Sequence, residues 1–319
     1  MKKRLQTLLK LGIMSGIVLY IINKSIASSS VARNLMKTSE NHYYEWRNGT
    51  IYYTKRGTGA PLLLIHDLYP SSSAQEWTEV IDRLAADHTV YALDLPGCGR
   101  SEKPATTYTN YFFVQMLSDF INDVIGECTD IVATGISSSF VIMTANMHPE
   151  LIGKFAMVNP LSPKQLSQIP DHKSQVLNYL ANVPIISTSF YYLMMSQNQI
   201  EYDFSEKYLY NPFHLNSRMI HTYYESAHLN GSDGKYLFTS LKSNYVNINV
   251  NAALSKITQE IHMISGSHMD NSDQIVDAYC KLKSDIHPHV VDKAKLLPQL
   301  EAPDVFIKLC DSIFKNTND

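Results

Sequence analysis

Residues 131–140 read Ile-Val-Ala-Thr-Gly-Ile-Ser-Ser-Ser-Phe and join a short apolar run to a second one, Val141–Ala145. The first run predicts a buried strand, and the second predicts the start of a buried helix. Between them stands Gly-x-Ser-x-Ser, a sharp strand-to-helix turn of the kind that presents a nucleophilic serine. The pattern therefore predicts Ser137 as a nucleophile, and an ordinary junction with a capping serine is the alternative.

The composition is that of an ordinary globular protein. The chain has 319 residues, of which 45% are hydrophobic and 18% are charged, and its formal net charge is -3. This near-neutral balance offers no electrostatic basis for binding nucleic acid. The four cysteines form no C-x-x-C pair, and the histidines show no metal-ligand spacing. The sequence therefore predicts neither a metal site nor a cofactor.

Residues 1–27 combine a basic start with an uncharged, mostly apolar run, Leu11–Ile22. With the leucines before it, this run approaches the roughly 20 residues that span a bilayer. Lys24 favours a retained single-pass anchor, and the alternative is a signal peptide cleaved near Ala27, which would release a secreted protein. Because basic residues slightly favour the N-terminal flank, we expect the rest of the anchored chain to be extracytoplasmic.

Strands alternate with helices after a polar linker at residues 28–41. Asn48-Gly49 predicts a hairpin over residues 43–54. Apolar runs predict buried strands at 62–65, 89–93, 131–133, 154–158 and 261–266, and helical spacing covers 76–86 and 109–126. This alternation predicts a doubly wound, mostly parallel sheet whose functional residues gather at the carboxyl ends of the strands.

Three motifs in one order resemble the α/β-hydrolase family of serine hydrolases and esterases. They are the run Leu62–His66, the glycine-punctuated loop Asp94–Ser101 and the turn Gly135–Ser139. The resemblance implies a hydrolase domain over residues 42–319, with a helical cap inserted at about 161–256. It also implies a serine nucleophile, a histidine base, a carboxylate that orients the histidine, and a backbone oxyanion hole.

The resemblance assigns the backbone N–H groups of Leu68 and Ser138 to the oxyanion hole. Family members usually carry His-Gly at the loop that supplies the first donor, whereas this chain has His66-Asp67. A carboxylate beside a developing oxyanion would oppose it unless Asp67 points away or is protonated. His66 is expected to brace this loop, and a direct catalytic role near the nucleophile is the alternative.

The other two catalytic positions also depart from the family pattern. Met269 stands where the family usually places its acid, so Asp270, one residue further on, is the candidate acid. Leu296 stands immediately before Leu-Pro, where the family carries its catalytic histidine, and leucine cannot accept a proton. His268 is therefore the candidate base, and Lys295 is a second candidate if burial lowers its pKa.

Two functions fit these residues. One is a membrane-anchored serine hydrolase of ester or similar acyl substrates, with Ser137 as nucleophile and an unconventional base. The other is a catalytically degenerate protein that keeps the fold and a pocket for binding a ligand or acting as a scaffold. In both cases we expect a small-molecule partner with an apolar acyl or alkyl group, because the cap is rich in aromatic residues.

Overall fold

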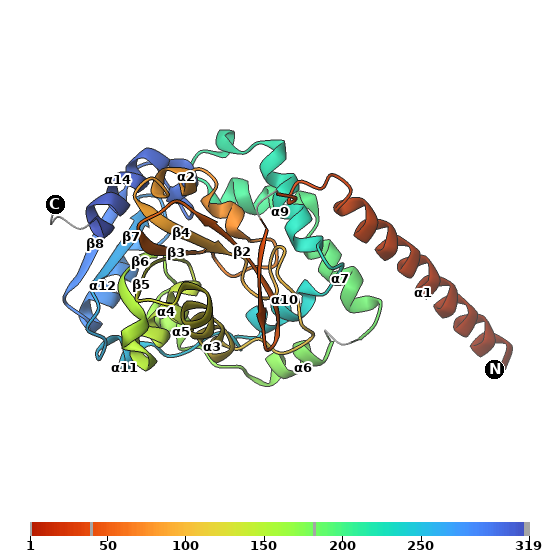
Figure 1. The fold of residues 1–319 in the computed structure, drawn as a ribbon. Helices are drawn as coiled ribbons and strands as arrows, with labels where there is room; N and C mark the ends of the chain where they lie inside the picture. The colour runs from red at the N-terminus through yellow and green to blue at the C-terminus, as the bar shows by residue number, and fades with distance from the viewer. Residues whose placement is uncertain (1, 39–40, 181–182, 316–319) are drawn as a thin grey trace.

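The computed structural model describes residues 2–38, 41–180 and 183–315 (Figure 1). In this part of the chain, eight strands form one sheet in the order β1-β2-β4-β3-β5-β6-β7-β8. The strands are β1 (His42–Trp46), β2 (Gly49–Arg56), β3 (Ala60–Ile65), β4 (His88–Leu93), β5 (Thr129–Thr134), β6 (Ile152–Val158), β7 (Ile261–Gly266) and β8 (Ile286–Val291).

The first two strands form the predicted hairpin. They pair antiparallel from His42 opposite Tyr53 to Trp46 opposite Gly49. Gly49 has a φ of +128°, a value that favours glycine, and this explains the Asn-Gly signal. β2 continues the sheet by pairing antiparallel with β4.

The remaining strands pair in parallel, so their carboxyl ends meet at one edge of the sheet. Alternate side chains of β3 enter different cores: Leu63 and Ile65 pack on one face, and Leu62 and Leu64 pack on the other. This double burial explains the continuous apolar runs of the strands. The predicted doubly wound, mostly parallel sheet is thus confirmed.

Helices cover both faces of the sheet, as Figure 1 shows. One face carries α3 (Asn110–Phe120), α4 (Ser137–Met147) and α12 (Ser272–Leu282), and the other carries α2 (Ile81–Leu84) and α14 (Pro303–Phe314). Short helices η1 (Ala74–Trp77), η2 (Ile121–Ile125), η3 (Pro149–Leu151) and α13 (Pro298–Glu301) complete the hydrolase-like part.

The helix predicted at 109–126 is confirmed, because α3 continues into η2 and ends at Gly126 with a φ of +80°. The continuous helix predicted at 76–86 is wrong. The segment forms only η1 and α2, separated around Val80, whose φ of -121° is not helical. Trp77, Val80 and Leu84 are nevertheless buried. The apolar spacing therefore marked the buried face correctly without specifying one regular helix.

A helical region is inserted between β6 and β7, as predicted for the cap. Its longer helices are α6 (His172–Leu180), α7 (Ile186–Met194), α8 (Gln197–Asp203), α9 (Ser217–His228) and α10 (Gly234–Lys242). Its shorter ones are α5 (Pro163–Leu166), η4 (Phe204–Tyr208), η5 (Pro212–His214) and α11 (Asn251–Leu254). Tyr191, Phe204 and Tyr223 are buried within it, so part of the aromatic content packs the region itself.

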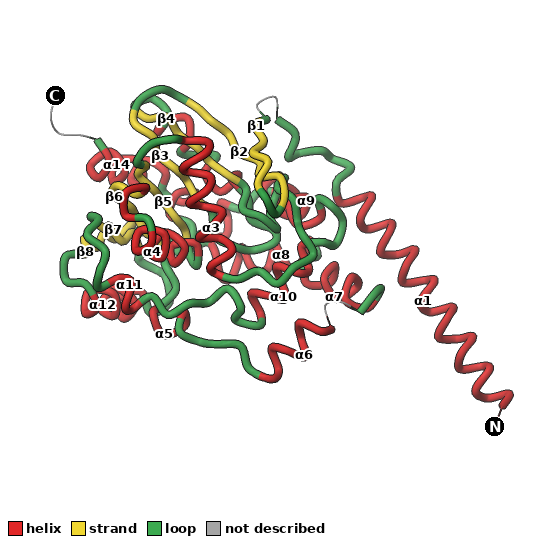
Figure 2. The backbone as a smooth tube through the Cα atoms, turned by 60° about the horizontal axis from the view of Figure 1, so that its bottom comes forward, coloured by secondary structure: helices red, strands yellow, loops and turns green. Residues whose placement is uncertain are grey.

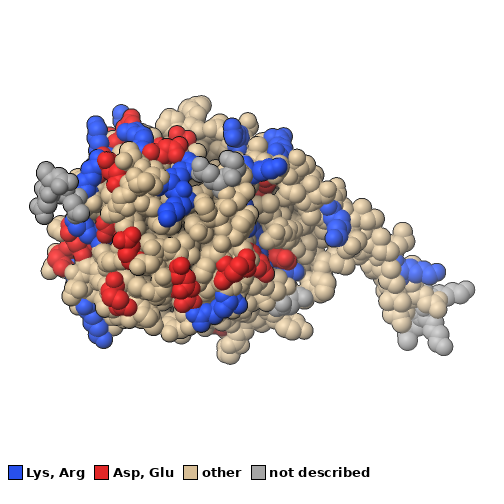
Figure 3. Space-filling model, in the orientation of Figure 1, with Lys and Arg blue, Asp and Glu red and all other residues tan. Residues whose placement is uncertain are grey.

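The N-terminal helix α1 (Lys2–Ser30) extends away from the globular part (Figures 1 and 2). Residues Arg4–Ser30 are long and apolar enough to cross a membrane, with a mean hydropathy of 1.8 in the most apolar window. In Figure 3 most of this helix is uncharged, whereas basic and acidic side chains are interspersed over the viewed globular surface. The helix is consistent with a membrane anchor or a signal sequence.

The last turns of α1 and the following segment pack on the cap. Asn23 is only 7% exposed, and its Nδ2 donates to Ile185 O at 3.3 Å and Ser189 Oγ at 3.0 Å. The backbone N–H groups of Leu35 and Met36 donate to the Glu225 carboxylate at 2.8 and 3.0 Å. The stretch predicted as a polar linker is therefore helical to Ser30 and then held on α9, while residues 39–40 lie outside the described residues.

The loop after β4 is organised by a buried ion pair. Asp94 is fully buried and accepts hydrogen bonds from Ala74 N at 2.7 Å, Arg100 N at 2.8 Å and Arg100 Nε at 2.7 Å. The carboxylate thereby joins η1 to the glycine-punctuated loop.

We expect Asp94→Ala to lower the free energy of unfolding by about 3–5 kcal/mol, because it leaves the Arg100 guanidinium buried without its partner. Urea unfolding of the full chain in detergent, followed by tryptophan fluorescence, measures this loss. The matched control is Asp82→Ala, which breaks an exposed pair with Arg56 and should change stability by about 1 kcal/mol or less. Equal losses in the two variants would contradict the structural role of Asp94.

Candidate functional site

The tip of the strand-to-helix turn is Gly135. β5 ends at Thr134 and α4 begins at Ser137. Gly135 has a φ of +58°, and a Cβ atom added to it would lie 2.1 Å from Asp67 Oδ1. A side chain at this position would therefore displace the Asp67 carboxylate.

Two backbone donors beside this turn converge on one oxygen atom. Asp67 Oδ1 accepts the N–H of Leu68 at 2.9 Å and the N–H of Ile136 at 3.1 Å. In a nucleophile elbow, the oxyanion donors are the residue after the nucleophile and a residue of the loop after β3. The observed pair fits that arrangement with Gly135 in the nucleophile position and a protein carboxylate oxygen where a substrate oxyanion would lie.

Ser137 and Ser138 use their polar groups elsewhere. Ser137 is fully buried as the first residue of α4, and its Oγ donates to His66 O at 2.8 Å. The Ser138 N–H points to Gly135 O at 3.3 Å, so the structure brings Ile136 rather than Ser138 together with Leu68. Ser137 as a nucleophile stays a prediction.

The sequence contains a pattern that also fits Gly135 in the nucleophile position. Small residues flank a nucleophile two positions before and two positions after it, and Ala133-x-Gly135-x-Ser137 satisfies that spacing as well as Gly135-x-Ser137-x-Ser139 does. The sequence motif did not favour Ala133-x-Gly135-x-Ser137, because its central residue is glycine, which has no reactive side chain.

His66 braces the loop after β3, as expected. Its Nδ1 lies 2.7 Å from Asp67 O, and its Nε2 accepts the N–H of Leu95 at 3.0 Å. The proton is therefore on Nδ1, and this N–H donates a hydrogen bond to the Asp67 carbonyl oxygen. Burial lowers the pKa of His66, which keeps the ring neutral.

A second buried carboxyl group, Glu76, lies behind Asp67 and was not singled out from the sequence. Glu76 Oε2 accepts the Asp67 N–H at 3.1 Å, and Oε1 accepts Gln299 Nε2 at 2.8 Å. Burial raises the pKa of Asp67 to about 6 and that of Glu76 to about 8. Glu76 is therefore mostly protonated at neutral pH, and Asp67 is mostly ionised.

The candidate acid and bases lie elsewhere on the carboxyl edge of the sheet. His268 is exposed, with Nδ1 2.9 Å from Ser267 Oγ and its ring 4.0 Å from that of Tyr210. Asp270 is exposed in the turn before α12, and Lys295 Nζ donates to Glu206 O. Among the described residues, no hydrogen bond joins Ser137 to any of these three side chains.

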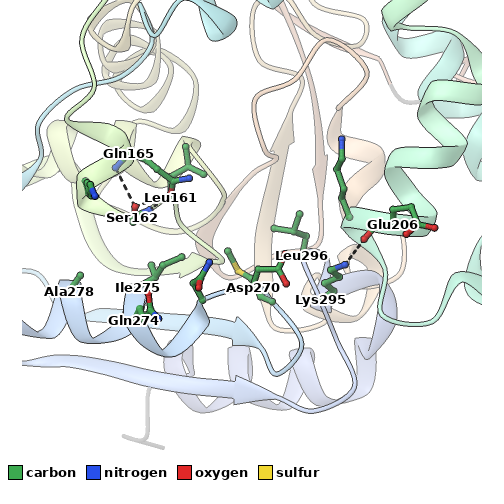
Figure 4. Close-up of a pocket in the computed structure, with 14 residues that line it drawn as sticks. Leu161, Ser162, Gln165, Glu206, Asp270, Gln274, Ile275, Ala278, Lys295 and Leu296 are labelled. Atoms are coloured by element: carbon green, nitrogen blue, oxygen red, sulfur yellow. Dashed lines mark hydrogen bonds between the residues drawn. The ribbon is translucent and has the colours of Figure 1, made fainter.

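A hollow of about 650 Å³ lies beside this edge (Figure 4). Its walls come from α5, η4, α12 and the loop before α13, and Figure 4 shows Lys295 reaching toward Glu206. Asn159 Nδ2 holds that loop by donating to Lys295 O and Leu296 O, both at 2.9 Å. The lining includes Lys164, Lys207, Met269, Asp270, Lys295 and Leu296.

No cluster of histidine, cysteine and carboxylate side chains with the arrangement of a metal site occurs within residues 2–38, 41–180 and 183–315. The polar groups at the turn are instead two carboxyl groups and backbone N–H donors. Lysines line the hollow beside it.

We expect the contribution of Glu76 to the free energy of unfolding to fall as the pH rises from 6 to 8, whereas buried histidines such as His66, whose pKa is lowered, contribute in the opposite direction below about pH 7. Above its ordinary pKa of 4.5, Glu76 is ionised in the unfolded chain but stays protonated in the folded chain until about pH 8. The folded state thus holds the extra proton, and the loss amounts to up to about 3 kcal/mol at about 1.4 kcal/mol per pH unit.

Chemical unfolding of the full chain across this range tests the effect. The free energy of unfolding of the wild-type chain, measured relative to that of Glu76→Gln at the same pH, should show this decline, because the amide does not ionise. Glu79→Gln, which changes an exposed neighbour on the same segment, should leave the decline unchanged. An unchanged decline in Glu76→Gln would refute the assignment.

Comparisons with known proteins agree with the fold. The sequence profile of the Alpha/beta hydrolase family matches residues 62–309, more than half of the chain. A soluble epoxide hydrolase of Corynebacterium sp. (strain C12) is 43% identical over 74 residues, which are 23% of this chain and 25% of that protein. The 2-hydroxy-6-oxo-6-(2'-aminophenyl)hexa-2,4-dienoic acid hydrolase of Metapseudomonas resinovorans is 26% identical over 129 residues, 40% of this chain and 44% of that protein.

The chain thus matches less than half the length of these two curated relatives. A solved structure, that of a membrane phospholipase A described as a bacterial virulence factor, is similar with a TM-score of 0.67 at 20% identity. The match covers 98% of both chains, and at this identity it concerns the fold alone. From the profile match, the eight-stranded sheet and the inserted helices, we conclude that the chain belongs to the Alpha/beta hydrolase family.

Proposed function

We propose that this α/β-hydrolase family member binds a small molecule without hydrolysing it and is held at a membrane by α1. One observation carries the proposal: Asp67 Oδ1 accepts both converging backbone N–H groups, and Gly135 at the turn has no side chain. Acyl hydrolysis centred on Gly135 would require a nucleophilic side chain and free oxyanion donors, whereas glycine has no side chain and Asp67 accepts both donors.

The energetic consequence for catalysis is large. Losing a single oxyanion donor lowers kcat by about 10²–10³ in enzymes of this type. Here a substrate oxygen would have to displace a buried carboxylate from both donors, and any ionised Asp67 would repel the developing negative charge. Leu296, in the family's histidine position, adds no group able to accept a proton.

The rival function is a serine hydrolase in which Ser137 reacts. That function needs the buried Ser137 hydroxyl to leave His66 O and to find a base such as His268 or Lys295. Family membership favours it, since the named relatives are hydrolases. A reactive-serine probe separates the two functions directly.

We expect no covalent labelling of the full chain by a fluorophosphonate probe, because Ser137 has no activating base and its hydroxyl is buried and hydrogen-bonded. Intact-protein and peptide mass spectrometry measure the labelling. Asp67→Gly, which frees the two donors, should remain unlabelled as well, because Gly135 still offers no nucleophile.

Ser137→Ala and Ser139→Ala provide matched controls, since both remove a buried hydroxyl from the first turn of α4. Labelling of the wild-type chain that disappears in Ser137→Ala but persists in Ser139→Ala would refute the proposal. It would establish an activated serine, and the search would then turn to its base.

The hollow beside the sheet edge is the proposed ligand site. Three lysines and two acidic residues line it, together with the apolar side chains of Met269, Leu296 and other residues. Lys207 pairs with Asp203, and Lys295 donates to a carbonyl, whereas Lys164 is exposed at the rim. This lining suits a small molecule with a carboxylate and an apolar body. The Metapseudomonas relative is likewise named as a hydrolase of a carboxylic acid.

Muconate, an unsaturated dicarboxylate, is a suitable probe for this site. We expect the full chain to bind it, and we expect Lys164→Gln to weaken binding about fivefold, which corresponds to about 1 kcal/mol for a solvent-exposed charge pair. Isothermal titration calorimetry measures both affinities. Lys308→Gln, which removes an exposed lysine on α14, should not change binding. No binding, or equal losses in both variants, would exclude this ligand class for the hollow.

A further inference from the structure

The cap exposes an unusual number of large apolar side chains on α6 and α7. We name this surface the α6–α7 face; its exposed members are Val176, Tyr179, Leu180, Ile186, Phe190 and Leu193. Contiguous apolar surface on a protein marks an interaction site more often than a solvated one.

The α6–α7 face also contains an apolar groove of about 290 Å³. Its lining includes Leu177, Leu180, Val183, Ile186, Phe190 and Phe238, so α10 contributes one wall. A groove lined in this way can accept a hydrocarbon chain and offers little to a polar ligand.

The N-terminal helix α1 meets the cap next to the α6–α7 face. Asn23 of α1 is hydrogen-bonded to Ile185 and Ser189, which lie at and within α7. In Figures 1 and 2, α7 lies beside the end of α1 that meets the globular part, and the rest of α1 projects away from it. The apolar side chains of α1, including Ile13, Ile17 and Ile21, are exposed in the same way. The two apolar surfaces are therefore neighbours.

Polar groups lie where α1 meets the cap. A hollow of about 490 Å³ there is lined by Tyr20, Lys24, Asp233 and Lys235, among others. The Lys24 ammonium lies 5.9 Å from the centre of the Tyr20 ring. Tyrosine and lysine are the residues that collect at the boundary between lipid tails and headgroups. This level on α1 thus marks the membrane surface, directly beside α7.

We propose that the α6–α7 face inserts into the leaflet that α1 enters, so that the cap rests in the bilayer surface. This inference rests on α1 being a membrane anchor, as in the proposed function. Apolar side chains of α6 and α7 would leave water for the acyl region, with Lys24 and Lys235 at headgroup level. An acyl chain of the same leaflet would fill the groove between α6, α7 and α10.

Fluorescence quenching by lipid tests the insertion. The full chain is reconstituted in phosphatidylcholine and phosphatidylglycerol vesicles, with the exposed Cys128 and the partly buried Cys280 replaced by serine. An environment-sensitive dye is attached at Val176→Cys or Leu193→Cys. The matched control is Val290→Cys on β8, because Val290 is 63% exposed and Val176 is 59% exposed. Ile17→Cys reports on α1 itself.

We expect nitroxide groups on the lipid tails to remove most of the emission from the dyes at Val176, Leu193 and Ile17, and none from the dye at Val290. The inference would be overturned if the dye at Ile17 were quenched while the dyes at Val176 and Leu193 emitted as strongly as the dye at Val290. That result would leave the anchor intact. If the dye at Ile17 were not quenched either, both the insertion of the α6–α7 face and the membrane anchor would be overturned. A spectral shift at Val176 that grows with protein density and resists lipid nitroxides would mean that a second copy covers the face, which also overturns the inference.

Discussion

The partly buried Asp67 carboxylate, shared between two backbone N–H groups, is the interaction on which the centre of this protein depends. It joins the loop after β3 to the turn after β5, through Leu68 on one side and Ile136 on the other. Because a buried carboxylate without partners is very unfavourable, the two donors and Asp67 stabilise one another. The same contact fills the position in which a hydrolase would stabilise its oxyanion.

The groups around Asp67 keep this arrangement rigid. Glu76 accepts the Asp67 N–H and a hydrogen bond from Gln299, which connects η1 to α13. His66 bonds the loop after β4, and Asp94 with Arg100 joins that loop to η1. A buried polar network with this many internal hydrogen bonds favours a single conformation. The centre is therefore closed and ordered, and the open hollow lies beside it, where Asn159 holds the Leu296 loop.

The cap connects this hollow to the N-terminal helix. Its α5 and η4 line the hollow, while α7 and α9 hold the end of α1 and the segment after it through Asn23 and Glu225. A cap seated in a bilayer would thus place the ligand site at a defined distance from the membrane surface. In that arrangement the proposed binding site and the proposed lipid contact would both involve the inserted helical region.

Local patterns in the sequence determined the sheet, because apolar runs buried on both faces and the Asn-Gly hairpin need no distant information. The family resemblance also singled out Asp67, Met269 and Leu296 as departures from the family's catalytic pattern, and these assignments stay predictions. Tertiary structure alone decided that the converging donors are Leu68 and Ile136, with Gly135 at the tip. Two alignments of small residues fit the same stretch, and only the positive φ and the distant Asp67 oxygen separate them. The broken helix at 76–86 and the docked segment before β1 likewise depend on partners far along the chain, which periodicity does not contain.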